Sequence, residues 1–317
     1  MLSDKASVAS TNGTSLRLLE AARQHGPISA ALVGADSTFA LQSAWQAHRE
    51  GILDPILVGP PMKIHRIATE IGWDISCVRV VAASGEAASA AAAVALASNG
   101  EVKGLLKGNV HTGTLLAAIL DRASGLRTGR RLTHAFHMSM PSGTELILSD
   151  AAINVAPDIE TLVDIVRNTI SLYVHLNRDA PKAAILSCTE EVTSSVPSSQ
   201  TAAEVARRCV KERILPPDSI CGPLALDIAV SLGAATIKGF EHPVAGNADV
   251  LIMPNIETGN ALFKSLVHFA GAIPAGLVLG ATVPVMLTSR ADSPEARTAS
   301  VCLACIVADS AQEEDAG

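Results

Sequence analysis

Aromatic residues are scarce in this sequence, and no long basic block interrupts it. The 317 residues include five Phe, two Trp and one Tyr, and the formal net charge is −7. A core therefore has to be built from Ala, Val, Leu and Ile, which suits a buried parallel sheet covered by helices. A net negative charge, with no cluster of Lys and Arg residues along the sequence, gives no reason to expect a nucleic-acid partner.

Long hydrophobic runs are also missing. The longest apolar stretch, 273–287, is broken by Pro274, Gly276, Gly280 and Pro284, and it is too short to cross a bilayer as one helix. The first residues carry charge and no apolar segment, so no secretory signal is expected. With 48% hydrophobic and 17% charged residues the chain is not disordered. We therefore expect a cytoplasmic protein with no membrane partner.

Common cofactor and metal signatures are not found either. The sequence has no GxGxxG after an expected strand, no GxxxxGK[ST], no GxSxG and no HExxH. His134 and His137 fall in an expected strand, where residues three apart point to opposite faces, so they cannot share a metal. Cys302 and Cys305 have CxxC spacing inside an apolar helical pattern, which favours core packing over a redox or zinc role.

What is present is an alternation of short apolar runs with longer amphipathic or Ala-rich segments, which is typical of βαβ units. An antiparallel pair is expected where 132–140 and 145–148 flank a turn containing Pro and Gly. The other expected strands are 30–33, 56–58, 78–81, 102–106, 183–186, 250–253, 276–279 and 285–287, and the expected helices are 37–50, 84–99, 112–121, 158–176, 199–213, 259–270 and 293–308. The pattern predicts an α/β fold with a mixed sheet, three layers and a cleft at the strand ends.

Three segments share one form, in which a strand, a small-residue turn with polar side chains and a helix start follow one another. Helix N-termini with free N–H groups bind anions, so three such turns favour an anionic ligand such as a phosphate. Lys107, Lys264 and Arg290 occur at these turns and strengthen that interpretation. The alternative is three ordinary loops whose helices are capped by Thr112, Thr258 and Ser293.

Five stretches of the sequence carry a more specific signal. They are LKGNVHT (106–112), LILSDAAIN (146–154), VAGNAD (244–249), MPNIETGNALFK (253–264) and LTSRADS (287–293). In this order they resemble the phosphate acetyltransferase and phosphate butyryltransferase family. The resemblance runs over roughly 34–307, and within the family it is greatest to the acetyltransferase part of bifunctional enoyl-CoA hydratase/phosphate acetyltransferases. No hydratase-like domain fits in the remaining residues.

This resemblance implies a fold like the isocitrate and isopropylmalate dehydrogenases, with two α/β domains around a cleft and usually a homodimer. It places the domains at 1–146 with 291–317 and at 147–290, with the last helix returning to the first domain. It also implies reversible transfer of an acetyl group between CoA and inorganic phosphate. CoA thioester and phosphate are then the small-molecule partners, and no metal or organic cofactor is required.

The family's catalytic residues match one turn of this sequence. Arg290 would bind phosphate through a bidentate fork, and Ser289 would donate to the phosphate or to the developing oxyanion. Asp292 matches the base that takes the CoA thiol proton. In some relatives that carboxylate lies further on, where this sequence has Glu295, so the choice stays open. Asp292 could instead cap the last helix.

The resemblance also implies substrate-binding residues on three other segments. Lys107, His111 and Thr112 would line the cleft from the first domain, although His111 could be a hydrogen-bonded structural residue. One of Arg127, Arg130 and Arg131 would meet a phosphate, and the alternative is a solvated basic turn. The second domain would contribute Asn255, Glu257, Gly259, Asn260 and Lys264. Gly259 would allow close approach of an anion, and Glu257 could instead accept from loop N–H groups.

Three other functions stay open. The first is phosphate butyryltransferase or another short-chain acyl specificity, since a methylene is worth only about 1–3 kcal/mol in an apolar pocket. The second is a non-catalytic acyl-CoA-binding protein of the same fold, against which intact Ser289, Arg290 and Asp292 argue. The third is a dehydrogenase of this architecture, which would need clustered Asp residues for a metal.

Overall fold

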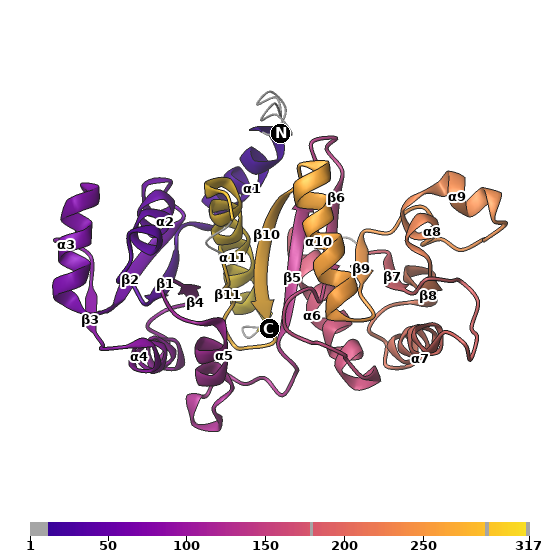
Figure 1. Ribbon diagram of the computed structural model, residues 1–317, viewed down its shortest axis with the longest axis horizontal. Helices are drawn as coiled ribbons and strands as arrows, with labels where there is room; N and C mark the ends of the chain where they lie inside the picture. The colour runs from indigo at the N-terminus through magenta and orange to yellow at the C-terminus, as the bar shows by residue number, and fades with distance from the viewer. Residues whose placement is uncertain (1–11, 178–179, 289–291, 315–317) are drawn as a thin grey trace, which may run out of the picture.

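The computed structural model describes residues 12–177, 180–288 and 292–314, and these form one mixed sheet between two layers of helices (Figure 1). The sheet has the order β3-β2-β1-β4-β11-β10-β5-β6-β9-β7-β8. Its strands are β1 (Ile28–Val33), β2 (Leu53–Gly59), β3 (Val80–Ala82), β4 (Gly104–Lys107), β5 (Thr133–Ser139), β6 (Glu145–Ser149), β7 (Ala183–Leu186), β8 (Ile220–Leu224), β9 (Val250–Ile252), β10 (Ile273–Leu279) and β11 (Val285–Met286).

Helices connect most of these strands, as the alternating pattern predicts. They are α1 (Asn12–His25), α2 (Thr38–Arg49), α3 (Pro61–Ile71), α4 (Glu86–Ser98), α5 (Thr112–Leu120), α6 (Ile159–Asn177), α7 (Pro197–Lys211), α8 (Leu226–Val230), α9 (Leu232–Ile237), α10 (Ile256–Ala270) and α11 (Pro294–Glu314). Short 3₁₀ turns lie at Arg122–Ser124 and Pro217–Ser219.

Strand directions divide the sheet into two parallel parts. Strands β3, β2, β1, β4 and β11 are parallel to one another, and β6, β9, β7 and β8 form a second parallel set. Between the two sets, β10 is antiparallel to both β11 and β5, and β5 is antiparallel to β6. The mixed sheet and the β5–β6 hairpin are therefore confirmed. Because β5 lies inside the sheet, its apolar side chains are buried within this chain.

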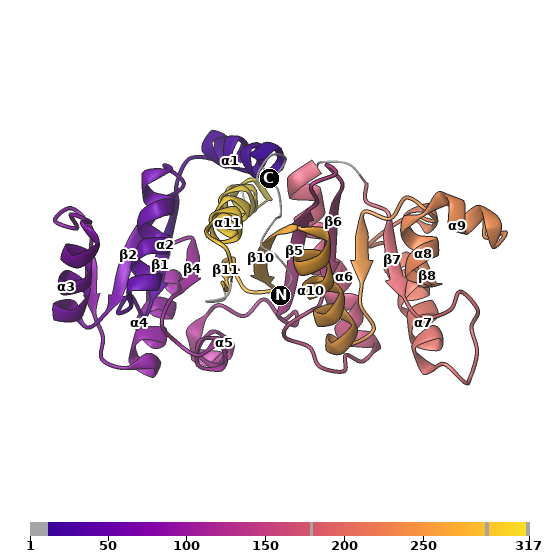
Figure 2. The ribbon, with the colours of Figure 1, turned by 45° about the horizontal axis from the view of Figure 1, so that its top comes forward.

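The helices cover the two faces of the sheet (Figures 1 and 2). On one face, apolar side chains of α1, α2, α3, α6, α7 and α11 form one cluster with the sheet. On the other face, α4 and α5 cover the first parallel set, while α8, α9 and α10 cover the second. Cys302 and Cys305 are buried in α11, as the apolar pattern predicts, and burial raises the pKa of both thiols, of Cys305 to about 11.

Local sequence explains several helix boundaries. The Ser37 hydroxyl accepts a hydrogen bond from the Ala40 N–H at 3.3 Å, so Ser37 caps α2 at the start of the helix expected over 37–50. The caps expected at Thr112 and Thr258 were wrong, because His111 and Asn255 occupy those N-cap positions. Pro61 begins α3. Pro is favoured at a first helical position because its missing N–H would be unpaired there anyway.

The last helix returns to the beginning of the chain, as the family resemblance implies. Helix α11 packs against α1 and α2 and also against β10 and α6. The division into 1–146 with 291–317 and 147–290 stays a prediction, since one continuous sheet runs through both parts. In the described part of the chain, no helix is long and apolar enough to cross a membrane.

Candidate active site

A single row of residues crosses the sheet at the point where the predicted site loops leave it. Leu106 pairs with Met286 and Ala135 pairs with Leu277. The antiparallel pairing of Val278 with Val285 puts Met286 opposite Leu277, and Ser149 lies opposite Ala135 by the β5–β6 register. Strands β4 and β11 leave this row in one direction, and β6 and β9 leave it in the other.

The loops that carry the predicted site residues therefore begin at the same level of the sheet. These loops fall into two groups. Four interstrand steps separate β4 from β6, or about 19 Å at roughly 4.8 Å a step. The loop after β4 and the turn after β11 form the first group, and the loops after β6 and β9 form the second. In the sheet order, β11 itself lies between β4 and β9.

The turn between β11 and α11 holds the predicted catalytic residues. Ser289 and Arg290 lie outside the described residues. Asp292 is half-buried, and its carbonyl oxygen accepts a hydrogen bond from Arg297 Nη1 at 2.8 Å. The Ser293 hydroxyl accepts from the Ala296 N–H at 3.2 Å. Ser293 therefore caps α11 as predicted, and the cap interpretation of Asp292 was wrong.

The loop after β4 is held against the loop after β1. The Asn109 N–H donates to the Gly34 carbonyl at 2.8 Å, and a Cβ on Gly108 would lie 2.5 Å from the same oxygen. The Asn109 amide also donates to Asp36 at 3.0 Å, and Lys63 pairs with Asp36 at 2.9 Å. Burial raises the pKa of Asp36, but these hydrogen bonds lower it more, so the carboxylate stays charged.

Of the three residues predicted on this loop, His111 has a defined partner. Its Nδ1 lies 2.7 Å from a Glu86 carboxylate oxygen, and its backbone N–H donates to Glu86 at 2.9 Å. These bonds hold the pKa of Glu86 below its ordinary value. Such contacts favour the structural interpretation of His111. Lys107 is half-buried at the end of β4, and Thr112 is exposed at the start of α5.

On the second group of loops, Gly259 and Asn260 join α10 to the loop after β6. The Asn260 amide donates to the Ala151 carbonyl at 3.2 Å, and a Cβ on Gly259 would lie 2.3 Å from the Asp150 carbonyl oxygen. The close approach at Gly259 is thus to protein backbone. Asn255 caps α10 by accepting from the Thr258 N–H at 2.9 Å.

Two charged residues predicted on α10 face solvent. Glu257 lies in the first turn of the helix and Lys264 lies two turns further on, and both are exposed. They remain available to a ligand on this side of the sheet.

The loop after β6 is organised by a buried carboxylate that the sequence argument did not single out. Asp150 accepts from the N–H groups of Ala152 at 2.8 Å and Ile153 at 3.0 Å, and from the Asn154 amide at 2.6 Å. Asn154 also donates to the Leu132 carbonyl at 2.9 Å, which ties this loop to the start of β5. The matching stretch 146–154 therefore contains a structural carboxylate.

The three arginines before β5 are all exposed. The Arg131 backbone is fixed, since its N–H donates to Asp164 at 3.0 Å and its carbonyl accepts from Asn168 at 2.9 Å. Hydrogen bonds from Thr161 lower the pKa of Asp158, and the charge of the Arg131 guanidinium lowers it further by a smaller amount. The geometry does not choose among Arg127, Arg130 and Arg131 as a phosphate ligand.

His134 is a buried titratable residue between the two groups of loops. Both ring nitrogens are buried without a hydrogen-bond partner among the described residues. The ring packs 4.1 Å from Phe136, and Gly276 leaves room for it on the neighbouring strand. Burial lowers the pKa of His134 to about 3, so the imidazole is neutral. Among the described residues no group of three or more His, Cys, Asp or Glu could hold a metal ion.

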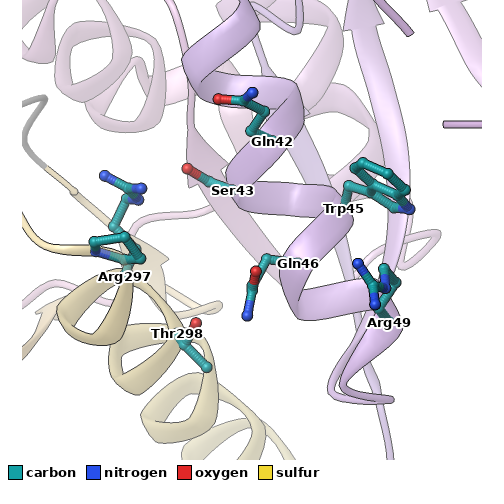
Figure 3. A pocket seen from close by; sticks show the side chains of 8 residues that line it. Gln42, Ser43, Trp45, Gln46, Arg49, Arg297 and Thr298 are labelled. Carbon is teal, nitrogen blue, oxygen red and sulfur yellow. The ribbon is translucent and has the colours of Figure 1, made fainter. Parts of the chain in front are cut away.

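A pocket of about 290 Å³ lies between α2 and the first turns of α11, beside the catalytic turn (Figure 3). Its walls carry Gln42, Ser43, Trp45, Gln46 and Arg49 from α2 and Pro294, Arg297 and Thr298 from α11. Sequence analysis missed this site because its polar residues come from two helices far apart in the chain, and each reads as an ordinary solvated helix face.

The fold and the ordered motifs agree with comparisons to known proteins. Residues 86–305 match the family described as phosphate acetyl/butaryl transferase. The chain belongs to this family and is a phosphate acyltransferase. It is 42% identical to a phosphate acetyltransferase of Rhizobium meliloti over 92% of both chains. It is also 37% identical to a phosphate butyryltransferase of Clostridium acetobutylicum, over 84% of this chain and 89% of that one.

Solved structures confirm the expected architecture. A branched-chain phosphotransacylase from Enterococcus faecalis superposes with a TM-score of 0.78 at 33% identity, covering 89% of this chain and 99% of the other. A 4-hydroxythreonine-4-phosphate dehydrogenase from Klebsiella pneumoniae shares the fold alone, with a TM-score of 0.55 at 12% identity over 89% of this chain and 99% of the other. The predicted dehydrogenase-like α/β fold is therefore confirmed.

Proposed function

We propose that this chain is a phosphate acetyltransferase that interconverts acetyl-CoA plus phosphate with acetyl phosphate plus CoA. The observation that carries this proposal is the identity of 42% over 92% of both chains to a protein of that name. The relative with butyryltransferase activity in its name makes a longer acyl group the runner-up. The reaction is acyl transfer between sulfur and oxygen, so we include no metal or organic cofactor.

The catalytic roles belong to the turn before α11. In this proposal Arg290 binds phosphate, and Ser289 donates to the oxyanion that develops on the acyl carbonyl. Asp292 takes the thiol proton of CoA when acetyl phosphate is the acyl donor. One contact and one difference in burial support Asp292 over Glu295. Ser293 supplies the helix cap, and Asp292 is half-buried at the turn while Glu295 is exposed on the helix.

The remaining predicted residues fit a ligand that spans the sheet. Lys107 and Thr112 lie on one side of the catalytic turn, and Asn255, Glu257 and Lys264 lie on the other. We propose that both sides bind parts of an acyl-CoA molecule, which is long enough to reach across the five interstrand steps from β4 to β9, or about 24 Å at roughly 4.8 Å a step. Gly259, Asn260 and His111 support the loops, and one arginine of the group 127–131 contacts a phosphate.

An arsenate-coupled assay with acyl-CoA esters of increasing length tests this proposal. Arsenate replaces phosphate, and the acyl arsenate hydrolyses, which pulls the reaction forward. We expect the highest kcat/KM with acetyl-CoA. A clear preference for butyryl-CoA would establish the runner-up, and no turnover with any ester would favour a non-catalytic acyl-CoA-binding protein.

We also propose that the protein is a homodimer in the cytoplasm, where its substrates are found. The β5–β6 hairpin lies inside the sheet and offers no surface for a dimer. Exposed apolar side chains of the second part of the chain support a dimer instead. They lie on α8, α9 and the end of α10, and they are Leu226, Val230, Leu232, Ile237 and Phe269.

A further inference from the structure

An arginine in the first turns of α11 reaches back to the turn that precedes the helix. The Arg297 Nη1 donates to the Asp292 carbonyl oxygen at 2.8 Å, across five positions of the chain. A hydrogen bond from a charged donor is roughly twice as strong as one between neutral groups. Because this carbonyl is bonded to the Asp292 Cα, the contact fixes the backbone from which the Asp292 side chain extends.

The guanidinium is itself held in place from α2. Its Cζ lies 4.4 Å from the centre of the Phe39 ring, within the range of a cation–π contact. Phe39 lies in the first turn of α2, two residues after the Ser37 cap. Figure 3 shows the Arg297 side chain at the end of the pocket away from Arg49. Arg297 therefore joins the start of α2 to the turn before α11.

Arg297 also places a positive charge near the proposed base. Burial lowers the pKa of Arg297, and the charges of Asp292 and Glu295 raise it by smaller amounts. An arginine side chain stays protonated in proteins, and a nearby positive charge favours the ionised form of a carboxylate. The ionised carboxylate accepts the thiol proton of CoA, the thiolate attacks the acyl carbon of acetyl phosphate, and phosphate leaves.

The helix itself is held by other contacts. Ser293 caps α11, and apolar side chains further along it, such as Leu303 and Ile306, are buried in the core. The contacts of Arg297 are made instead with the turn and with α2. We propose that Arg297 is a positioning residue for acyl transfer, which holds the backbone of Asp292 where its carboxylate meets the CoA thiol. This inference rests on the proposed function.

Two substitutions at Arg297 separate its charge from its shape. Arg297→Gln removes the charge, while Arg297→Lys keeps it and can still donate to a carbonyl. We expect Arg297→Gln to lower kcat for acetyl phosphate plus CoA by about tenfold to a hundredfold, since a displaced catalytic group reacts slowly. KM for CoA should stay within about twofold, and Arg297→Lys should recover part of kcat. Arg66→Gln on α3, which removes an exposed arginine beside Glu70, is the control and should change neither.

A double-mutant cycle shows whether Arg297 acts through Asp292. In an Asp292→Asn background, the further change Arg297→Gln should slow the reaction by less than about threefold, because the thiol proton has already lost its acceptor. A merely structural role predicts that the two losses multiply, which would overturn the proposal. A raised KM for CoA at unchanged kcat would also overturn it, by making Arg297 a substrate-binding residue.

Phe39→Leu gives a second route to the same test. It removes the ring under the guanidinium and leaves Arg297 in the chain, so kcat should fall by less than in Arg297→Gln. If Arg297→Gln does not fold, as judged by urea unfolding, the cycle with Asp292→Asn is measured with Phe39→Leu instead. Losses that multiply in that cycle would contradict the positioning role.

The proposed function can fail separately from this inference. A wild-type protein that transfers no acyl group would contradict the proposed function, and amide hydrogen exchange over 292–298 would then test Arg297 alone. We expect faster exchange of this segment in Arg297→Gln than in the wild type, and no change in Arg66→Gln. Equal exchange in all three proteins would show that Arg297 does not hold the turn and would overturn the inference.

Discussion

At the scale of single residues, Arg290 has the role with the largest expected effect. If it holds the phosphate, Arg290→Ala should weaken phosphate binding and slow turnover together, by about 10²–10³ in rate. Arg290→Lys should recover only part of this loss, because an ammonium group cannot form the bidentate fork. Initial rates at varied phosphate give both parameters. An Arg290→Ala enzyme with an unchanged KM for phosphate would remove Arg290 from the site.

Asp292 can be tested through pH. Asp292→Asn should slow the reaction of acetyl phosphate with CoA most, since the thiol proton then has no acceptor. Raising the pH towards the thiol pKa of about 8.5 should restore part of that rate, because CoA then supplies its own thiolate. A flat pH response in a folded variant would place the base elsewhere, with Glu295 the next candidate.

His134 should make the fold sensitive to acid. Its pKa is lowered by burial to about 3, so the unfolded chain binds the proton more readily than the folded one. Stability should therefore fall as pH decreases below about 6.5, by at most about 3 kcal/mol at pH 4. Urea unfolding of His134→Gln should show a smaller loss between pH 7 and pH 4 than the wild type. The same loss in His134→Gln would contradict this, and the exposed His65→Gln is the control.

At the scale of elements, the contact of α10 with the loop after β6 depends on one glycine. Gly259→Ala would put a Cβ 2.3 Å from the Asp150 carbonyl oxygen, and backbone cannot move away freely. Unfolding free energy should fall by about 1–3 kcal/mol. Gly113→Ala on α5 meets nothing within 4 Å and should be neutral or stabilising, since Ala favours helix. Equal urea midpoints for the two variants would contradict this packing.

Sequence analysis did not predict β8 or the helices α1, α3, α8 and α9, and the reasons differ between these elements. Strand β8 contains Gly222 and Pro223, which argue against a strand, yet β8 lies at the edge of the sheet, where Pro is tolerated. Helices α8 and α9 have five and six residues, too few for a periodic pattern. The long, strongly apolar strands and the Ala-rich helix α4 were predictable because local sequence and burial favour the same structure.

The residues of the candidate site likewise divide into those that the sequence predicts and those that only the structure shows. Residues on strand-to-helix turns could be identified from sequence, because each turn keeps its motif within a few positions. The Asn154–Leu132 contact, the Glu86–His111 pair and the pocket at Arg297 join distant segments, and no local pattern signals them. Family resemblance supplied the roles of Ser289, Arg290 and Asp292, and geometry then showed that Ser293 caps α11 and that Gly259 serves packing.

At the scale of the whole molecule, the exposed apolar side chains of α9 and α10 favour assembly. Ile237 is 88% exposed and Phe269 is 90% exposed, and burying such side chains is favourable. Light scattering at micromolar concentration should therefore give about twice the chain mass of 32.6 kDa. Ile237→Asp with Phe269→Ser should shift the mass towards that of one chain. A wild-type mass near 32.6 kDa would contradict the dimer.

The central claim is that phosphate itself receives the acyl group. The direct measurement is phosphorus NMR of the enzyme with acetyl-CoA and inorganic phosphate, alongside release of the CoA thiol. We predict that acetyl phosphate forms in equal amount to free CoA and that neither forms without phosphate. Release of CoA that does not depend on phosphate, with no acetyl phosphate resonance, would contradict the account.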